Sequence, residues 1–176
     1  MELLVTMTMI VLATAMVLPN LGALVPSAKL EGSGKQILRT IDWVRSEARI
    51  QARPMTLEFD LDKARWRMVY PPELRLTLDQ DEKELAAWSD DWNALEKGVV
   101  FGGAGDGRHG IAKKGFYKMT FDEHGFSNDQ MIVLRLTDDP QLVWGLTLRG
   151  LTGSTTVFES EKGEEPELPY VEEGAF

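Results

Sequence analysis

The sequence predicts an α+β protein in which one long N-terminal helix packs on an antiparallel β-sheet. Residues 1–53 combine an uncharged apolar run with a stretch whose apolar residues recur at helical spacing. From Met55 onward the period changes to two, in short stretches separated by turn residues. A helix followed by hairpins is the α+β arrangement.

The composition excludes several classes of protein. The chain has 176 residues, a net charge of −9 and no cysteine. It is long enough for one core of ordinary size, and without cysteine it has no disulfide, thiolate metal site or thiol nucleophile. Much of the negative charge is local, because residues 159–176 hold seven acidic residues and one basic residue. We expect these residues to form an acidic C-terminal tail.

The apolar run extends over 26 uncharged residues, from Leu3 to Ala28. As a helix it would be roughly 39 Å long, more than the roughly 30 Å hydrocarbon core of a bilayer, so residues 1–28 are predicted to form a transmembrane helix. Its threonines can bond to helix carbonyls, and Pro19 is expected to kink it. A cleaved signal peptide would need basic residues before the run, and a buried helix would need a larger protein.

Residues 29–158 are predicted to form the globular domain, beginning with an amphipathic helix that ends before Pro54. Gly32 and Gly34 weaken the middle of this helix and are expected to let it flex. Its basic residues are interpreted as a solvated face rather than a nucleic-acid stripe. The predicted apolar face consists of Leu30, Ile37, Ile41, Val44 and Ala48, and the bases are Lys35, Arg39, Arg45, Arg49 and Arg53.

A hairpin is predicted from Met55–Phe59 and Ala64–Tyr70. Residues 79–93 are predicted to form a short helix, with Trp88 and Trp92 on one face. We interpret these two side chains as core packing rather than a stacking platform for a ligand. Further strands are predicted at Leu74–Leu78, Val99–Phe101, Phe116–Phe121, Met131–Thr137, Leu142–Leu148 and Thr155–Glu159.

No pattern of residues indicates an active site. Residues 105–110 match G-x-G-x-x-G but lead into a strand pattern instead of a helix, which argues against a dinucleotide site. His109 and His124, the only histidines, lack the spacing of a zinc site. The acids between Asp79 and Glu84 lack the glycine and spacing of a calcium loop. We therefore expect no catalytic residue, metal or cofactor, and no enzyme.

The beginning of the chain resembles a known family. Met1-Glu2-Leu3-Leu4-Val5, followed by the apolar run and Pro19, is similar to the N-terminus of type IV pilins and type II secretion pseudopilins. Residues 46–57, 119–127 and 146–154 resemble the minor pseudopilins of the GspH and FimT group. The resemblance implies a pilin-like fold. Compared with that family, the chain begins after the basic leader, the cleavage-site glycine and the first mature residues.

The resemblance implies a minor pseudopilin, a structural subunit of the type II secretion pseudopilus. It implies partners as well: other pseudopilins in a hetero-oligomeric filament, with Glu2 paired to a neighbour's N-terminal amine, and prepilin peptidase for a full-length precursor. The expected location is the inner membrane, single-pass, with the C-terminal domain in the periplasm.

Two alternatives remain at this stage. One is a FimT-like minor type IV pilin active in DNA uptake or pilus biogenesis. It is ranked second because the C-terminus is acidic, which disfavours nucleic acid as a partner. Outside the helix, the only compact basic cluster in the sequence consists of Lys113, Lys114 and Lys118. The other is a periplasmic enzyme or ligand-binding module, which no group of residues supports.

Overall fold

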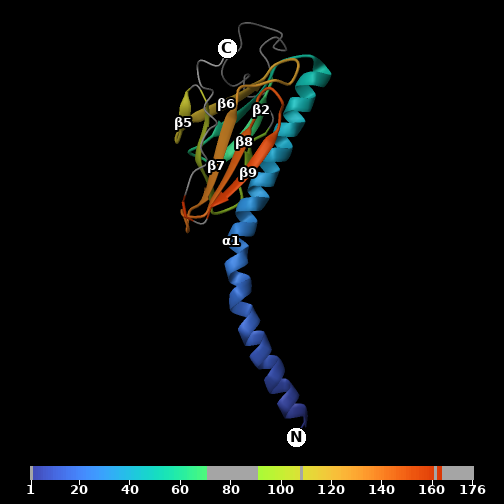
Figure 1. The fold of residues 1–176 in the computed structure, drawn as a ribbon, viewed down its shortest axis with the longest axis vertical. Coiled ribbons are helices and arrows are strands. Elements are labelled where there is room, and N and C mark those ends of the chain that lie inside the picture. The colour runs from blue at the N-terminus through green and yellow to red at the C-terminus, as the bar shows by residue number, and fades with distance from the viewer. Residues whose placement is uncertain (1, 71–90, 108, 161, 164–176) are drawn as a thin grey trace.

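The computed structural model describes residues 2–70, 91–107, 109–160 and 162–163, apart from the side chains of residues 2 and 15–25. These residues form one helix and nine strands. Helix α1 (Glu2–Gln51) is an unbroken element of 50 residues. Its C-terminal half lies along the globular domain and its N-terminal half projects away from it (Figure 1). The predicted long N-terminal helix is therefore confirmed.

α1 ends two residues before the predicted position, in a turn built around a left-handed residue. Ala52 has a φ of 49°. The Arg53 amide donates to the Ala48 carbonyl at 3.1 Å, and the Ala52 amide donates to the Arg49 carbonyl at 3.3 Å. This pair of hydrogen bonds is the Schellman motif, which here turns the chain out of the helix just before Pro54.

Four strands form the first antiparallel sheet, sheet A: β1 (Met55–Asp60), β2 (Arg65–Val69), β3 (Asn93–Ala94) and β6 (Phe116–Phe121), in the order β3-β2-β1-β6. The predicted hairpin of β1 and β2 is confirmed, and β6 has its predicted bounds. Asn93, expected at the end of a helix, begins β3 instead. The other predictions between residues 71 and 90, including Trp88, lie outside the described residues.

Five strands form sheet B: β4 (Val99–Asp106), β5 (Gly110–Ala112), β7 (Gln130–Leu136), β8 (Val143–Leu148) and β9 (Thr155–Ser160), in the order β5-β4-β7-β8-β9. The predicted strands at β7, β8 and β9 are confirmed to within a residue at each end. β4 continues past Phe101 through a bulge, and β5 was not predicted. The Gly- and Ala-rich stretch of β4 lacks the alternation that reveals a strand.

The sequence predicted one sheet, but the strands divide into two. β6 pairs with β1, whereas the next strand, β7, pairs with β4 and β8. Alternation of apolar and polar residues shows which side chains face a core, but it does not show which strands pair. Among the described strands, the chain therefore crosses between the sheets three times, from β3 to β4, from β5 to β6 and from β6 to β7.

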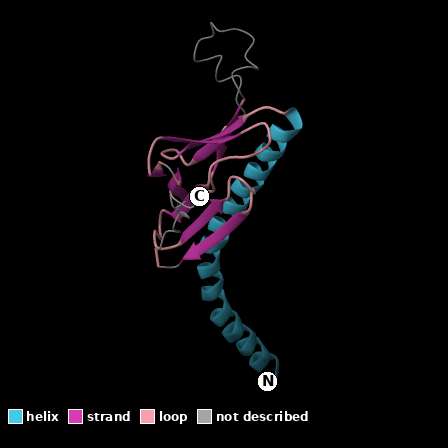
Figure 2. Ribbon diagram, turned by 45° about the horizontal axis from the view of Figure 1, so that its top comes forward, coloured by secondary structure: helices cyan, strands magenta, loops and turns pink. Residues whose placement is uncertain are grey.

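One face of α1 packs against both sheets and forms the core with them (Figure 2). The five apolar residues predicted for this face are all at most 4% exposed, which confirms the prediction. Large side chains from the strands complete the core. The fully buried ones include Phe59, Trp66, Phe121, Ile132, Leu134 and Trp144.

A polar network joins the two sheets. The Tyr117 hydroxyl donates to Gln130 Oε1, and Gln130 Nε2 donates to Ser127 Oγ at 3.2 Å. Ser127 Oγ in turn donates to the Thr120 carbonyl at 2.8 Å. Burial, together with the nearby Asp106 charge, raises the pKa of the Tyr117 hydroxyl, so Tyr117 remains a donor at neutral pH.

Candidate functional site

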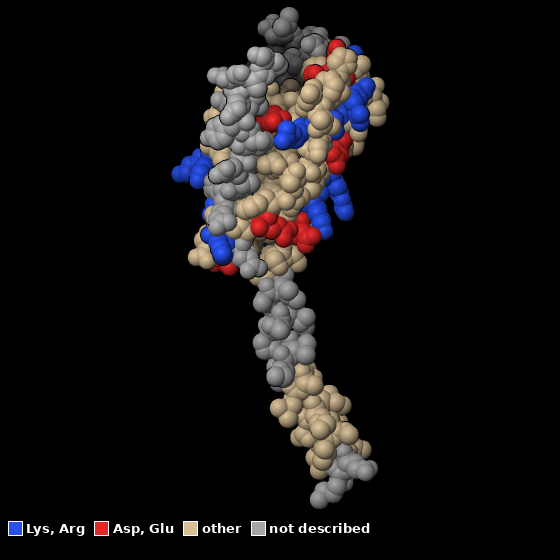
Figure 3. Space-filling model, in the orientation of Figure 1, with Lys and Arg blue, Asp and Glu red and all other residues tan. Residues whose placement is uncertain are grey.

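The N-terminal end of α1 forms an apolar stalk, defined as residues 3–14. The hydroxyl groups of Thr6, Thr8 and Thr14 donate to carbonyls within the helix, at 2.7 to 3.0 Å, as predicted. No charged side chain interrupts the stalk, which Figure 3 shows as an uncharged rod below the domain. Its large side chains are 56% to 74% exposed: Leu3, Leu4, Val5, Met7, Met9, Ile10, Val11 and Leu12. A contiguous apolar surface of this kind marks contact with lipid or protein.

The two predicted assembly residues both belong to α1. Glu2 is its first residue, and Pro19 lies in its N-terminal half. Their side chains are outside the described part of the chain, so the pairing of Glu2 and the kink at Pro19 stay predictions. Within the residues that the structure describes, no helix combines the length and hydropathy needed to cross a membrane.

The middle of α1 packs closely on β8 through a glycine. A Cβ added at Gly34 would lie 2.5 Å from Cζ2 of Trp144. Ser33 is also buried, and its Oγ accepts a hydrogen bond of 3.4 Å from the Glu96 amide. The expected flexing segment is thus part of an unbroken helix, in which the missing side chain of Gly34 makes room for the indole.

Arg45 holds the C-terminal end of α1 to two loops. Its Nε donates to the Gly125 carbonyl and its Nη2 to the Thr152 carbonyl, both at 2.9 Å. Gly125 and Gly153 have φ values of 76° and 69°, so both adopt the left-handed conformation that favours glycine. A Cβ on Gly153 would lie 1.6 Å from Arg45 Nη1. One guanidinium therefore fixes both loops to the helix.

The three stretches that resemble the GspH and FimT group meet at this end of the domain. Residues 119–127 and 146–154 are joined by the bond from the Ser127 amide to the Gly150 carbonyl, at 3.2 Å. The Gly150 amide donates to Asp129 Oδ1 at 2.8 Å. Residues 46–57 contain the end of α1 and the start of β1. The second and third stretches hold the end of α1, because Gly125 and Thr152 accept the hydrogen bonds of Arg45.

The five bases of the amphipathic helix do not act as one surface. Lys35 pairs with Glu31 at 2.5 Å, and Arg45 is committed to the two loops. Arg49 Nη2 donates to Ser46 Oγ at 3.4 Å. Arg39 and Arg53 are exposed. This distribution agrees with the interpretation as a solvated face.

A cluster of basic and aromatic side chains lies on sheet A. The guanidinium groups of Arg65 and Arg67 lie 4.2 and 4.3 Å from the centre of a Trp92 ring, within cation–π range. Phe116, which is 62% exposed, has its ring 6.4 Å from that of Trp92. Trp92 thus packs on the sheet surface through arginines, and Lys118 extends the cluster along β6.

Two buried carboxylates neutralise much of this cluster. Asp60 pairs with Arg65 at 2.9 Å, and Glu58 lies between Arg67 at 2.8 Å and Lys118 at 3.6 Å. Burial on its own would raise the pKa of Asp60. The hydrogen bonds from the Arg65 side chain and the Lys63 amide outweigh burial and hold that pKa below its ordinary value. Asp60 is therefore ionised at neutral pH.

The two histidines and the G-x-G-x-x-G match lie in a hairpin and a turn. His109, 80% exposed, pairs with Asp106 at 3.0 Å in the hairpin of β4 and β5. The G-x-G-x-x-G match is this hairpin, so it lacks the strand-to-helix setting of a dinucleotide site. His124 contacts Glu123 at 3.4 Å. Among the described residues, no three His, Asp or Glu side chains gather as a metal site would require.

A helix with an apolar stalk, packed on two antiparallel sheets, defines the pilin-like fold. Solved structures match it. The minor pseudopilin EpsH of the Vibrio cholerae type 2 secretion system aligns at a TM-score of 0.52 and 14% identity, over 74% of this chain and 97% of EpsH. The type IV minor pilin FimU of Pseudomonas aeruginosa aligns at 0.51 and 12% identity, over 78% of this chain and 97% of FimU.

The similarity is one of fold. No known sequence-family profile and no curated protein sequence matches the chain. A second EpsH structure aligns at a TM-score of 0.53 and 10% identity, over 74% of this chain and 96% of that one. The matched proteins are described as a minor pseudopilin and a type IV minor pilin.

Proposed function

We propose that the protein is a minor pseudopilin, a structural subunit of the type II secretion pseudopilus. The observation that supports this most strongly is the apolar stalk, whose eight large side chains are at least 56% exposed. A helix that is apolar on all sides needs lipid or other helices around it. In this proposal the stalk first anchors the subunit in the inner membrane as a single pass, with the domain in the periplasm. It later packs against the helices of other pseudopilins in a hetero-oligomeric filament.

Within this proposal, Glu2 pairs with the N-terminal amine of a neighbouring subunit. A carboxylate among apolar helices is stabilised when an opposite charge compensates it. Prepilin peptidase would process a precursor that carries the leader, and Pro19 would bend the helix between the stalk and the domain. Both residues lie in α1, in the half that projects from the domain.

The test is incorporation of the Glu2→Ala variant, expressed as a full-length precursor in the source organism. Removing one partner of a buried ion pair costs about 3–5 kcal/mol, so incorporation should fall by about two orders of magnitude or more. The matched control is Asp42→Ala, because Asp42 is an exposed acid elsewhere on α1. Normal incorporation and secretion with Glu2→Ala would overturn the assignment.

A minor pilin active in DNA uptake is the second candidate. The observation in its favour is the basic and aromatic cluster, since basic side chains beside an aromatic ring suit a single nucleic-acid strand. Against it, Glu58 and Asp60 neutralise the charges of Arg65, Arg67 and Lys118. A gel shift with single-stranded DNA at low salt separates the candidates. Binding that is lost in a Trp92→Ala, Lys118→Ala double variant would reverse their order.

A further inference from the structure

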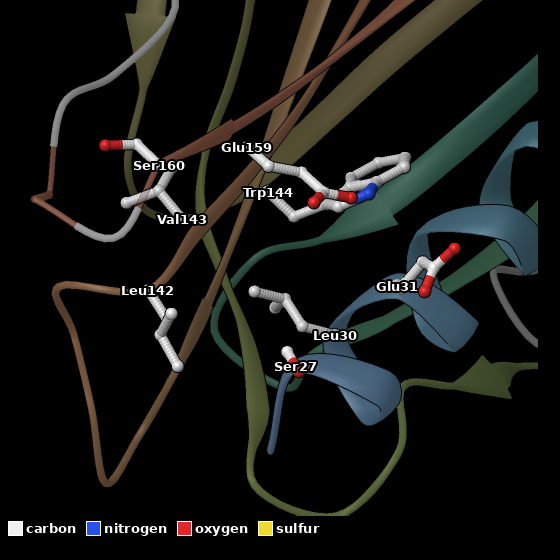
Figure 4. Close-up of a pocket in the computed structure, with 8 residues that line it drawn as sticks. All are labelled: Ser27, Leu30, Glu31, Leu142, Val143, Trp144, Glu159 and Ser160. Carbon is white, nitrogen blue, oxygen red and sulfur yellow. The ribbon is translucent and has the colours of Figure 1, made fainter. Parts of the chain in front are cut away.

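A groove of 430 Å³ lies where α1 enters the globular domain (Figure 4). One wall comes from α1, and the other comes from β8, β9 and the residue before β8. β9 is the last strand of sheet B among the described residues, so the groove borders an edge of that sheet. The lining residues are Ser27, Leu30, Glu31, Leu142, Val143, Trp144, Glu159 and Ser160.

The groove combines an apolar floor with an acidic rim. Leu30 is buried, and Leu142 packs against the same core. Two carboxylates stand at the rim. Glu31 is paired with Lys35 at 2.5 Å, whereas Glu159 forms no ion pair with any residue that the structure describes. The rim therefore carries a negative charge that is not compensated within the described chain.

The wall also contains a hydrogen-bond donor that is not used. Trp144 is 1% exposed, and its Nε1 has no acceptor among the described residues. Trp144 lies directly opposite Glu159 in the register of β8 and β9, so both side chains lie on one face of the sheet. That face is the one covered by α1, because the indole contacts Gly34. Buried donors in native proteins normally have partners, so this donor is available to an acceptor that enters the groove.

We propose that the groove binds an arginine or lysine side chain, with its backbone carbonyl, from a neighbouring pilin-class subunit. The methylene groups of that side chain would lie on Leu30 and Leu142, as the stems of long basic side chains do. Its cation would pair with Glu159, and the carbonyl would accept the Trp144 N–H. An arginine fits best, because its guanidinium binds a carboxylate through two parallel hydrogen bonds. The inference rests on the proposed function only for the source of this side chain.

The C-terminal tail of the same chain is a poor occupant. It begins beside the groove, since the Gly163 amide donates to the Gln141 carbonyl at 2.8 Å, next to Leu142. Residues 164–176, however, hold five acids and no base. Their charge opposes entry beside Glu31 and Glu159. Charge complementarity therefore favours a basic segment of another subunit.

The experiment uses the full chain in micelles of a neutral detergent, with the tryptophan indole groups labelled for NMR. The probe is N-acetyl-arginine-N-methylamide, which carries both the cation and the carbonyl. N-acetyl-norleucine-N-methylamide lacks the cation, and agmatine lacks the carbonyl. The Trp144 indole resonance, assigned with a Trp144→Phe variant, should shift saturably with the arginine probe. Each comparison probe should bind about tenfold more weakly, because each lacks one charge-assisted or buried hydrogen bond.

Variants make the result specific to the groove. Glu159→Gln should weaken the arginine probe about tenfold, whereas Glu123→Gln, an exposed acid on the loop after β6, should bind it like the parent chain. No shift at Trp144, or equal binding of all three probes, would overturn the proposal. A Trp144 shift on deleting residues 164–176 without any probe would assign the groove to the tail instead. The assay needs no filament, so its failure leaves the proposed function standing, and a failure of the Glu2 test leaves this result standing.

Discussion

The six-membered ring of Trp144 lies against the backbone of α1 at Gly34, and an added Cβ there would stand 2.5 Å from Cζ2. Real Cβ atoms do not approach a ring so closely, so a larger residue would displace the indole. Both residues are buried, and they join the middle of α1 to β8 of sheet B. This contact therefore sets how closely the helix approaches the sheet.

Gly34→Ala should destabilise the domain. Displacing a packed indole costs about 1–3 kcal/mol, which outweighs the gain of up to about 1 kcal/mol from helix propensity. Gly32→Ala is the matched control, since its Cβ would meet only the end of the Glu96 side chain, at 3.2 Å. That change should be neutral or stabilising. Urea unfolding measures both, and a stabilising Gly34→Ala would contradict the packing argument.

Ala52→Gly should stabilise the end of α1. Ala52 holds a φ of 49°, a conformation that glycine adopts without steric cost. The expected gain in free energy of unfolding is about 0.5–1 kcal/mol. Ala52→Val should act in the opposite direction, because a β-branched side chain is strained at positive φ. Thermal unfolding of the two variants against the parent chain checks the prediction, and equal midpoints would refute it.

Arg45→Ala should free two loops at once. It removes the hydrogen bonds to the Gly125 and Thr152 carbonyls, with an expected loss of about 2 kcal/mol. Amide exchange should become faster at residues 122–127 and 149–154. Arg39→Ala is the control, because Arg39 is exposed on the same helix, and it should change stability by less than about 0.5 kcal/mol. Unchanged exchange in both loops would show that Arg45 does not hold them.

Asp60 should make stability depend on pH in the acid range. Its pKa in the folded state is lowered, so its contribution is complete above the unfolded value of about 3.9 and is lost as the pH falls through the folded pKa. Unfolding by urea should therefore become easier below about pH 4. Asp60→Asn should be less stable at pH 7 by about 1–3 kcal/mol and should flatten this dependence. Exposed Asp138→Asn should retain the parent profile, and an unchanged slope in Asp60→Asn would exclude Asp60 as its source.

The sequence revealed features that depend on local spacing. The buried face of α1 followed from apolar residues at helical intervals, and the β1–β2 hairpin followed from alternation around a turn. Both are short-range patterns that burial imposes directly on the order of residues. The apolar stalk was visible for the same reason, as a continuous uncharged run.

Features that join distant parts of the chain were not predicted. Arg45 and Thr152 are 107 positions apart, and nothing in the spacing of either indicates their hydrogen bond. Gly34 was noticed in the sequence, but a glycine inside a helix can mean either low helix propensity or close packing against another element. The packing role required Trp144, which comes from another element. Division into two sheets was hidden because pairing depends on contacts that alternation does not encode.

Because α1 is continuous, the orientation of the stalk determines the direction in which the domain faces. The helix is unbroken from Glu2 to Gln51, so each residue between stalk and domain adds about 1.5 Å and about 100° of rotation. Inserting one residue before Leu30 would turn the groove and β9 by more than a quarter of a circle. Inserting seven would restore their heading to within about 20° while lifting the domain by about 10 Å. The rotation of the domain and its distance from the stalk are thus both set by the length of α1. A neighbouring subunit that binds this domain must match both.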